Sequence, residues 1–368
     1  MAPSRDEILE ALKRVIDPEL RRSVVELDMV RALEIEDGDV ALTIALTVAG
    51  CPLRADFEQQ VDRELGGVPG VRSVTLSFDV MTPEEKAALT ARLRGGVTER
   101  TKGVSIDAST RVLAVCSGKG GVGKSSLTVN LAAAFSSLGL RTGVLDADVY
   151  GYSIPGMLGV HQRPIAVDQM IVPPVRGDLK VMSIGFFLDD NAPVMWRGPM
   201  LHRALEQFLS DVHWGELDWL VVDMPPGTGD VSISLGQLLP RAEVVVVTTP
   251  QRAAQEVAVR AAEMARKTNM RLLGVVENMS YLVGTGQPIF GAGGGETLAS
   301  ALGVPLLGGI PLDPALREAA DLGDPVVLRE PQAESSRAIT ALAEAIVAIP
   351  REAGVGITKP LPLVSTAG

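Results

Sequence analysis

The sequence predicts an α/β protein with a mainly parallel sheet flanked by helices, preceded by a small α+β domain. From residue 111 onward, short strands made of apolar residues alternate with helical stretches, which is the pattern of a parallel sheet covered on both faces. Before residue 93, a hairpin pattern is combined with helical periodicity. The 368-residue chain, 46% hydrophobic, is long enough for one large and one small domain.

Residues 1–92 are the predicted small domain. A helix is expected to begin after Ser4, which can cap it, and to stop at Pro18. The strands "VRALEIE" and "VALTIALTV" are separated by "DGD", which indicates a hairpin. Apolar residues spaced by four predict a second helix after Pro52, and "VRSVTLSF" is expected to close the domain as a strand.

The large domain is predicted to span residues 111–350. Residues 93–110 are mostly polar, contain glycine and lack an apolar period, so we interpret them as a linker. Residues 351–368 are rich in proline and glycine, which favours a flexible tail.

A glycine-rich loop, "GKGGVGKS", follows the strand "VLAVC" and precedes the helical stretch "SLTVNLAAAFSSLG". It fits the phosphate-loop pattern G-x-x-x-x-G-K-S/T in the strand-to-helix context which that pattern requires. Backbone N–H groups would turn toward phosphates, Lys124 would meet the terminal phosphates, and the Ser125 hydroxyl would bind Mg²⁺. The predicted nucleotide-binding residues of this loop are Gly118, Lys119, Gly120, Gly121, Val122, Gly123, Lys124, Ser125 and Ser126.

A dinucleotide fingerprint is the alternative interpretation of the same loop. Its glycines also fit G-x-G-x-x-G, and Asp146 lies near the end of the next strand, where a ribose-binding acid would be. However, Lys124 and Ser125 follow the last glycine, and "WLVVD" places Asp223 at a second strand end. Hydride transfer needs neither feature, so a phosphate loop is favoured.

Three aspartates at strand ends are candidates for the chemistry of phosphate hydrolysis. Asp223 is predicted to lie on the Mg²⁺ side of the site, since a strand-end carboxylate beside the loop can hold the metal. In "LDADVYG", we expect Asp146 to assist Mg²⁺ binding and Asp148 to orient the attacking water. Aspartates after strands are also often helix caps or turn formers, so that reading stays open.

Six motifs together resemble the Mrp/ApbC branch of the deviant Walker A P-loop NTPases, over nearly all of residues 111–330. They are "SGKGGVGKS", "DADVYG", "WRGPM", "VVDMPPGTGD", "VVENMSY" and "FGAGGGE". The first domain, with "TVAGCPL", resembles the PaaD-like domain often fused in front of Mrp ATPases. The resemblance implies a homodimeric, Mg²⁺-dependent ATPase that binds iron-sulfur clusters and transfers them to apoproteins, with iron-sulfur assembly proteins as further partners.

The resemblance also implies roles for two residues. Lys119 matches the lysine that crosses the homodimer interface and touches the nucleotide of the partner subunit, which makes hydrolysis depend on dimer formation. Asn278, in "VENMS", matches the residue at the adenine edge, where an amide offers a donor and an acceptor. From the residues alone, Lys119 could equally be a solvated loop lysine, and Asn278 a turn residue.

The cysteines depart from the family pattern. Cluster-carrying members usually have a C-x-x-C pair shortly after "ENMS", but this chain reads "ENMSYLVGTGQPIFGAGGG" and has two cysteines in all. Cys116, in the strand before the phosphate loop, is predicted to be buried and structural. Cys51 precedes Pro52 at a strand-to-helix turn that favours a thiolate, so it is the candidate iron ligand, with a buried structural role as the alternative.

Charge and composition narrow the partners. A net charge of −11 and a pI of about 4.9 argue against nucleic acid and anionic membranes. The chain shows no signal peptide and no membrane-spanning run, so we expect a cytoplasmic protein. Two alternatives remain. One is a MinD- or ParA-like positioning ATPase, for which no terminal amphipathic helix or basic surface is evident. The other is a metal-free, nucleotide-gated adaptor.

Overall fold

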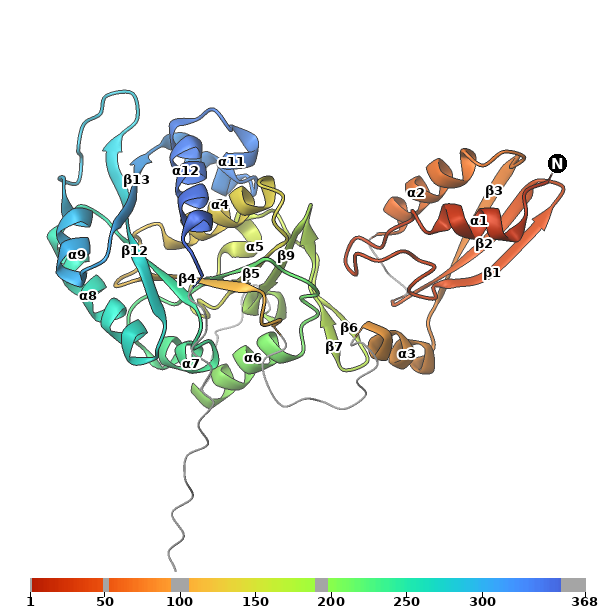
Figure 1. The fold of residues 1–368 in the computed structure, drawn as a ribbon, viewed down its shortest axis with the longest axis horizontal. Helices are drawn as coiled ribbons and strands as arrows, with labels where there is room; N and C mark the ends of the chain where they lie inside the picture. The colour runs from red at the N-terminus through yellow and green to blue at the C-terminus, as the bar shows by residue number, and fades with distance from the viewer. Residues whose placement is uncertain (1, 49–52, 94–105, 189–197, 352–368) are drawn as a thin grey trace, which may run out of the picture.

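The computed structural model describes residues 2–48, 53–93, 106–188 and 198–351, and the side chains of all of these except 198 and 199. The described elements form a small unit and a large unit (Figure 1). The small unit holds a three-stranded sheet of order β1-β2-β3. Its elements are α1 (Arg5–Leu12), β1 (Val30–Glu36), β2 (Asp39–Leu46), α2 (Arg54–Gly66), β3 (Ser73–Val80) and α3 (Pro83–Leu93).

The predicted hairpin is present, and the helices show where sequence reasoning was incomplete. β1 and β2 pair antiparallel, whereas β3 adds to β2 in parallel after α2. Ser4 caps α1 as expected, but the helix ends at Leu12, earlier than the stop predicted at Pro18. The chain turns back instead, because Ile16 pairs with Ser23 in a short bridge. Helix α3 was not predicted, although Thr82 and Glu85 form a capping box at its start.

The large unit is built on an eight-stranded sheet of order β13-β12-β11-β4-β10-β5-β9-β8. Neighbouring strands are parallel, except that β8 runs antiparallel to β9, so the predicted mainly parallel sheet is confirmed. Strands β8, β9 and β13 of this sheet were not identified from the sequence. The strands are β4 (Arg111–Ser117), β5 (Thr142–Asp146), β8 (Val175–Arg176), β9 (Leu179–Ser183), β10 (Trp219–Asp223), β11 (Glu243–Thr248), β12 (Arg271–Leu282) and β13 (Leu306–Leu312).

Helices cover both faces of this sheet (Figure 1), which explains why its central strands are apolar on both sides. A short 3₁₀ helix, η1 (Ile184–Phe187), follows β9. One face carries α4 (Lys124–Ser137), α5 (Ile154–Met157), α10 (Pro314–Asp321), α11 (Val326–Arg329) and α12 (Glu334–Ala348). The other carries α6 (Gly198–Ser210), α7 (Asp230–Leu238), α8 (Arg252–Lys267) and α9 (Gly294–Leu302).

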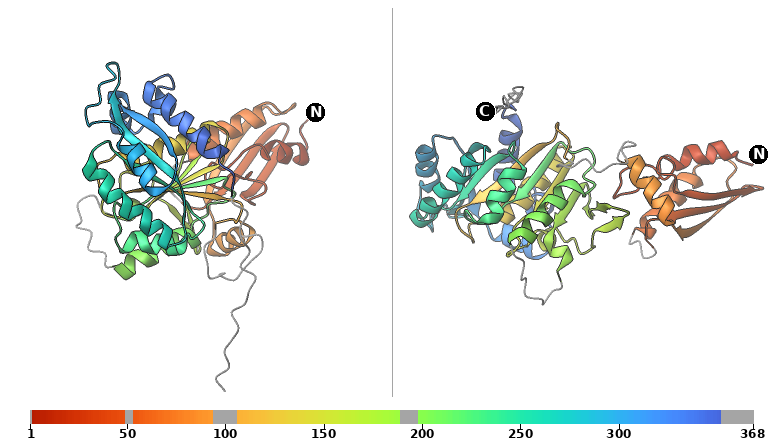
Figure 2. Two further views of the ribbon diagram at one scale, coloured as in Figure 1. Left: turned by 60° about the vertical axis from the view of Figure 1, so that its left-hand side comes forward. Right: turned by 90° about the horizontal axis from the view of Figure 1, so that it is seen from below.

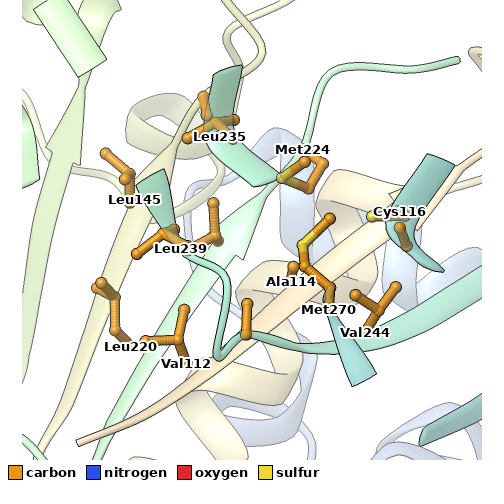
Figure 3. Close-up of a cluster of buried hydrophobic side chains, with 14 of the residues drawn as sticks. Val112, Ala114, Cys116, Leu145, Leu220, Met224, Leu235, Leu239, Val244 and Met270 are labelled. Atoms are coloured by element: carbon orange, nitrogen blue, oxygen red, sulfur yellow. The ribbon is translucent and has the colours of Figure 1, made fainter. Parts of the chain in front are cut away.

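Figure 3 shows part of the core on the α6 to α9 side, in which Cys116 packs among Ala114, Met224 and Val244. The polar residues of the candidate site lie at the carboxyl ends of the strands that form this core, with Asp146 ending β5 and Asp223 ending β10. None of the helices described is long and apolar enough to cross a membrane. The predicted domain boundaries remain predictions, since most of the expected linker and tail lies outside the described residues.

A hairpin of the large unit joins the two units. Strands β6 (Ile165–Val167) and β7 (Met170–Val172) pair antiparallel beside α3 (Figure 1). Val167, Met170 and Val172 are buried in the same apolar cluster as the core of the small unit. The Thr90 hydroxyl of α3 also donates a hydrogen bond to the Val167 carbonyl at 3.2 Å. Figure 2 shows the small unit at one end of the molecule, beyond this hairpin.

Candidate active site

The glycine-rich loop connects β4 to α4 in the predicted place. Gly123 precedes α4 with φ at 83°, in the left-handed region that favours glycine. A Cβ atom at Gly123 would lie 2.1 Å from the Asn278 amide nitrogen, and one at Gly118 would lie 2.3 Å from the Ala258 nitrogen in α8. Gly118 is thus required by the close approach of the α8 backbone, and Gly123 by its positive φ together with the nearby Asn278 side chain.

Lys124 lies at the start of α4 and is 6% exposed. Its Nζ is 2.8 Å from Asp223 Oδ2 and 3.6 Å from Asp148 Oδ2. The structure therefore brings together the predicted phosphate-binding lysine and two of the three predicted aspartates. In this arrangement the ammonium group offsets the charge of buried carboxylates at the place where the loop would receive phosphates.

Asp223, at the end of β10, is fully buried and is held by two hydroxyl groups of α4. Ser125 Oγ donates to Asp223 Oδ2 at 2.6 Å, and Thr128 Oγ1 donates to Asp223 Oδ1 at 2.8 Å. Ser125 was predicted to act with Asp223, but Thr128 was missed. Its spacing was the available signal, because a residue four positions after Lys124 lies on the same face of the helix.

Asp146, at the end of β5, is opposite Asp223 in the parallel ladder and is also fully buried. It accepts a hydrogen bond from the Ser183 hydroxyl at 3.0 Å and longer ones from the Ser153 and Ile154 N–H groups. Burial, and then the charge of Asp223, raise the pKa of Asp146 to about 7. Ser183 could not be found from the sequence because strand β9 itself was not recognised.

Asp148 combines a turn hydrogen bond with a position beside the phosphate loop. Its side chain is 12% exposed and faces Lys124, while its Oδ1 accepts the Gly151 N–H at 3.2 Å. Burial raises the pKa of Asp148, and the nearby Lys124 ammonium acts in the opposite direction. The carboxylate is thus placed beside the phosphate-binding lysine, where it can accept a hydrogen bond from a water molecule.

The donor set at the strand ends suits Mg²⁺. Ser125 and Asp223 are already in contact, and Asp146 adjoins Asp223 through the strand register. Hydroxyl and carboxylate oxygens are the ligands that Mg²⁺ prefers. Burial, and to a lesser degree the neighbouring Asp223 carboxylate, raise the pKa of Asp146, and a divalent cation beside both carboxylates would favour their charged forms. These residues therefore fit the metal.

Lys119 and Asn278 have different surroundings. Lys119 is partly buried, and within the described part of the chain no carboxylate forms an ion pair with it. Asn278, on β12, is 4% exposed, and its Nδ2 donates to the Val122 carbonyl at 2.8 Å. The structure thus places Asn278 against the phosphate loop, a contact that the sequence did not suggest. Its predicted adenine contact stays a prediction.

The two cysteines also differ. Cys116 is buried, and burial raises its pKa to about 12, so its thiol stays protonated at neutral pH. This agrees with the predicted structural role. Cys51 lies outside the described residues. Within the described residues, no three histidine, cysteine, aspartate or glutamate side chains form a group that could hold a metal ion, and the donors named above for Mg²⁺ are two carboxylates and a hydroxyl.

Comparison with known families decides the relationship. Residues 108–347 match the family described as NUBPL iron-transfer P-loop NTPase, and residues 5–76 match an iron-sulfur cluster assembly protein family. The chain belongs to the iron-transfer P-loop NTPase family. This confirms the resemblance to Mrp-type ATPases with an assembly-type domain in front. The large unit is therefore a nucleotide-binding domain with the P-loop NTPase fold.

Relatives within the family extend over nearly the whole chain. The iron-sulfur cluster carrier protein of Mycobacterium tuberculosis H37Rv is 52% identical over 350 residues, 92% of each chain. The protein of the same name from Synechocystis is 40% identical over 351 residues, 93% of this chain and 96% of the relative.

Two solved structures cover the large unit. The nucleotide-binding protein of Archaeoglobus fulgidus in complex with ADP is 36% identical, with a TM-score of 0.53, and the match covers 61% of this chain and 89% of that one. The septum site-determining protein MinD of Pyrococcus horikoshii, complexed with Mg-ADP, is 23% identical, with a TM-score of 0.50 and coverage of 64% and 96%. The second likeness shows the fold alone.

Proposed function

We propose that this chain is a cytoplasmic, homodimeric, Mg²⁺-dependent ATPase that carries iron-sulfur clusters and delivers them to apoproteins. The observation that carries the proposal is the contact of Lys124 and Ser125 with Asp223 at the end of the phosphate loop, in a chain of the iron-transfer family. The cluster is cargo, whereas ATP and Mg²⁺ belong to the large unit.

The loop residues divide the work of ATP hydrolysis. Backbone N–H groups of residues 120–125 bind the phosphates, and Lys124 exchanges part of its contact with Asp223 for the β- and γ-phosphates. Ser125, Asp223 and Asp146 would hold Mg²⁺, which supplies positive charge beside the phosphate oxygens. Asp148 orients the water that attacks the γ-phosphorus, so that the bond to the ADP oxygen breaks and ADP and phosphate are formed.

Lys119 supplies the second cation from the partner subunit. Lys119 is partly buried in the loop that would bind the nucleotide, and within the residues that the structure describes no carboxylate forms an ion pair with its ammonium group. A cation that approaches the γ-phosphate only in the dimer stabilises charge in the transition state without binding the ground state tightly. Hydrolysis would therefore depend on dimer formation.

The cargo site follows from the number of thiols. Cys116 is buried and protonated, so Cys51 is the candidate cluster ligand of each subunit. A cluster of four irons and four sulfides ordinarily takes four thiolates. A dimer with two Cys51 thiolates needs further ligands from an assembly protein, a client apoprotein or a small thiol. We therefore propose a labile cluster that is shared during transfer.

A metal-free adaptor is the second candidate, and the absence of the C-x-x-C pair after "ENMS" favours it. An anaerobic transfer assay separates the two. The reconstituted chain is mixed with an apo-ferredoxin, and cluster arrival is followed by absorbance with and without Mg-ATP. A carrier transfers iron and sulfide to the acceptor in a nucleotide-dependent manner. A chain that binds the acceptor but retains no iron after reconstitution is an adaptor instead.

A further inference from the structure

The small unit touches the large unit at a second place, besides the apolar hairpin β6–β7. The loop after α1 meets the β8–β9 hairpin, where Arg21 Nη2 lies 3.0 Å from Asp178 Oδ1. Asp17 and Glu19 of the same loop interact electrostatically with Lys180 of β9. We call these five residues the interdomain cluster: Asp17, Glu19, Arg21, Asp178 and Lys180.

The centre of the interdomain cluster is buried. Lys180 is 3%, Asp17 5% and Glu19 7% exposed. Burial and the charge of Arg21 lower the pKa of Lys180 to about 8, and burial and the charge of Asp17 raise the pKa of Glu19 to about 8. Taking these charges out of water costs much of what their mutual attraction contributes, so the charged residues here depend on keeping their partners. The interface thus has an apolar half at the β6–β7 hairpin and a charged half at the interdomain cluster.

Both halves converge on one backbone segment of the large unit. Lys180 Nζ donates to the His213 carbonyl at 2.9 Å. The His213 N–H donates to the Ile171 carbonyl at 2.7 Å, and the Ile171 N–H donates to the Asp211 carbonyl at 2.8 Å. Ile171 is part of β7, whose neighbours Met170 and Val172 are buried in the core of the small unit. A continuous run of hydrogen bonds thus connects the charged half of the interface with the apolar half.

Strand β9 connects the interdomain cluster to the nucleotide site. In the parallel ladder Lys180 is opposite Gly143 and Ser183 is opposite Asp146 of β5. Ser183 donates its hydroxyl hydrogen to Asp146. Three residues of a strand span only about 10 Å. β9 lies between β5 and the last strand, β8, and the Arg21–Asp178 contact is at the turn between β8 and β9.

We propose that the interdomain cluster is a latch through which docking of the small unit and binding of Mg-nucleotide stabilise each other. The docked loop holds β9, and β9 holds Asp146 through Ser183. By thermodynamic reciprocity, nucleotide binding with Mg²⁺ strengthens docking by the same factor that docking strengthens binding. Lys180 is accordingly a positioning residue. This inference rests on the proposed function for its nucleotide, and it assigns the small unit a part in controlling that site.

The test uses the full-length chain with Lys180→Met, which removes the charge and the hydrogen bond to His213 but keeps an apolar chain. Mg-ADP affinity is measured by calorimetry and the interdomain arrangement by small-angle scattering. The wild-type chain should contract when Mg-ADP is added. Lys180→Met should be more extended, should not contract, and should bind Mg-ADP about fivefold more weakly. The affinity for ADP without Mg²⁺ should change less, because β9 acts through Ser183 on Asp146, which is a proposed Mg²⁺ ligand.

Arg271→Met is the matched control. Arg271 is a partly buried cation at the start of β12 and contacts Glu243 of β11. Both strands lie in the half of the strand order that is away from β9. It should lower stability without changing the scattering response or the Mg²⁺ dependence. If Lys180→Met fails to fold, Arg21→Gln on the small unit removes the contact with Asp178 and should show the same loss of contraction.

The coupling is overturned if Lys180→Met and Arg21→Gln contract like the wild-type chain and bind Mg-ADP equally well. It is also overturned if Arg271→Met reproduces their effects, since the change would then reflect lost stability alone. A wild-type chain that binds no Mg-ADP overturns the proposed function, and the coupling with it. In that case docking by the interdomain cluster is still tested by the scattering of Lys180→Met without nucleotide.

Discussion

The phosphate loop and the segment after "ENMS" belong to the same unit, but they differ in how much of their expected chemistry is present. The loop is surrounded by a cation, two hydroxyl donors and buried carboxylates within hydrogen-bond reach of one another. Residues 283–293 contain no cysteine, histidine or carboxylate. The phosphate loop thus has the residues that nucleotide binding needs around it, whereas residues 283–293 contribute no thiol, imidazole or carboxylate that could bind iron.

The largest effect is expected at Lys124. Lys124→Ala removes the cation that contacts Asp223 and would face the terminal phosphates, so the site becomes strongly negative. Nucleotide affinity should fall about 100-fold or more, which calorimetry with Mg-ATP can measure. Near-normal affinity would mean that this loop is not the phosphate site. The phosphate loop could then no longer be contrasted, as a complete site, with the cysteine-free segment after "ENMS".

Lys119→Ala should separate binding from hydrolysis. If the lysine acts across the dimer, ATP affinity stays close to the wild-type value, while the hydrolysis rate falls about 100-fold because a transition-state cation is lost. Phosphate release and calorimetry on the same preparation measure both quantities. Hydrolysis at the wild-type rate would contradict the cross-subunit role, and loss of affinity would show that Lys119 binds the ground state.

A smaller effect is expected from Asp148→Asn. The amide keeps the shape and the position beside Lys124 but removes the carboxylate charge, so turnover should fall about tenfold. The ATP-bound dimer should live longer as a result, which sedimentation velocity with ATP detects. If the variant stays monomeric or hydrolyses ATP normally, another residue orients the water.

The sequence was most informative where all the residues that define a structure are adjacent in the chain. The phosphate loop, its strand and its helix were predicted because the glycines, Lys124 and Ser125 are adjacent in the chain. Contacts between distant segments were not found. Ser183 supports Asp146 across 37 residues, and Asn278 supports Val122 across 156 residues. Such contacts depend on strand order, which no local pattern encodes.

The interface between the units was also beyond sequence reasoning. The hairpin β6–β7 was not predicted as a structural element, and Val167, Met170 and Val172 are buried in one cluster with the core of the small unit. Lys180, in an unrecognised strand, would read as an ordinary surface lysine. Cys116 is the contrasting case, since a cysteine within an all-apolar strand was predicted to be buried and is buried.

Iron and sulfide analysis after anaerobic reconstitution tests the central claim most directly. We predict fewer than four irons per dimer in the wild-type chain, a further loss in Cys51→Ser, and no change in Cys116→Ala, whose thiol is buried with its pKa raised to about 12. ATP hydrolysis should be little affected by Cys51→Ser. A stable cluster of four irons that survives Cys51→Ser would contradict the account, because the chain would then hold its cargo with ligands other than Cys51.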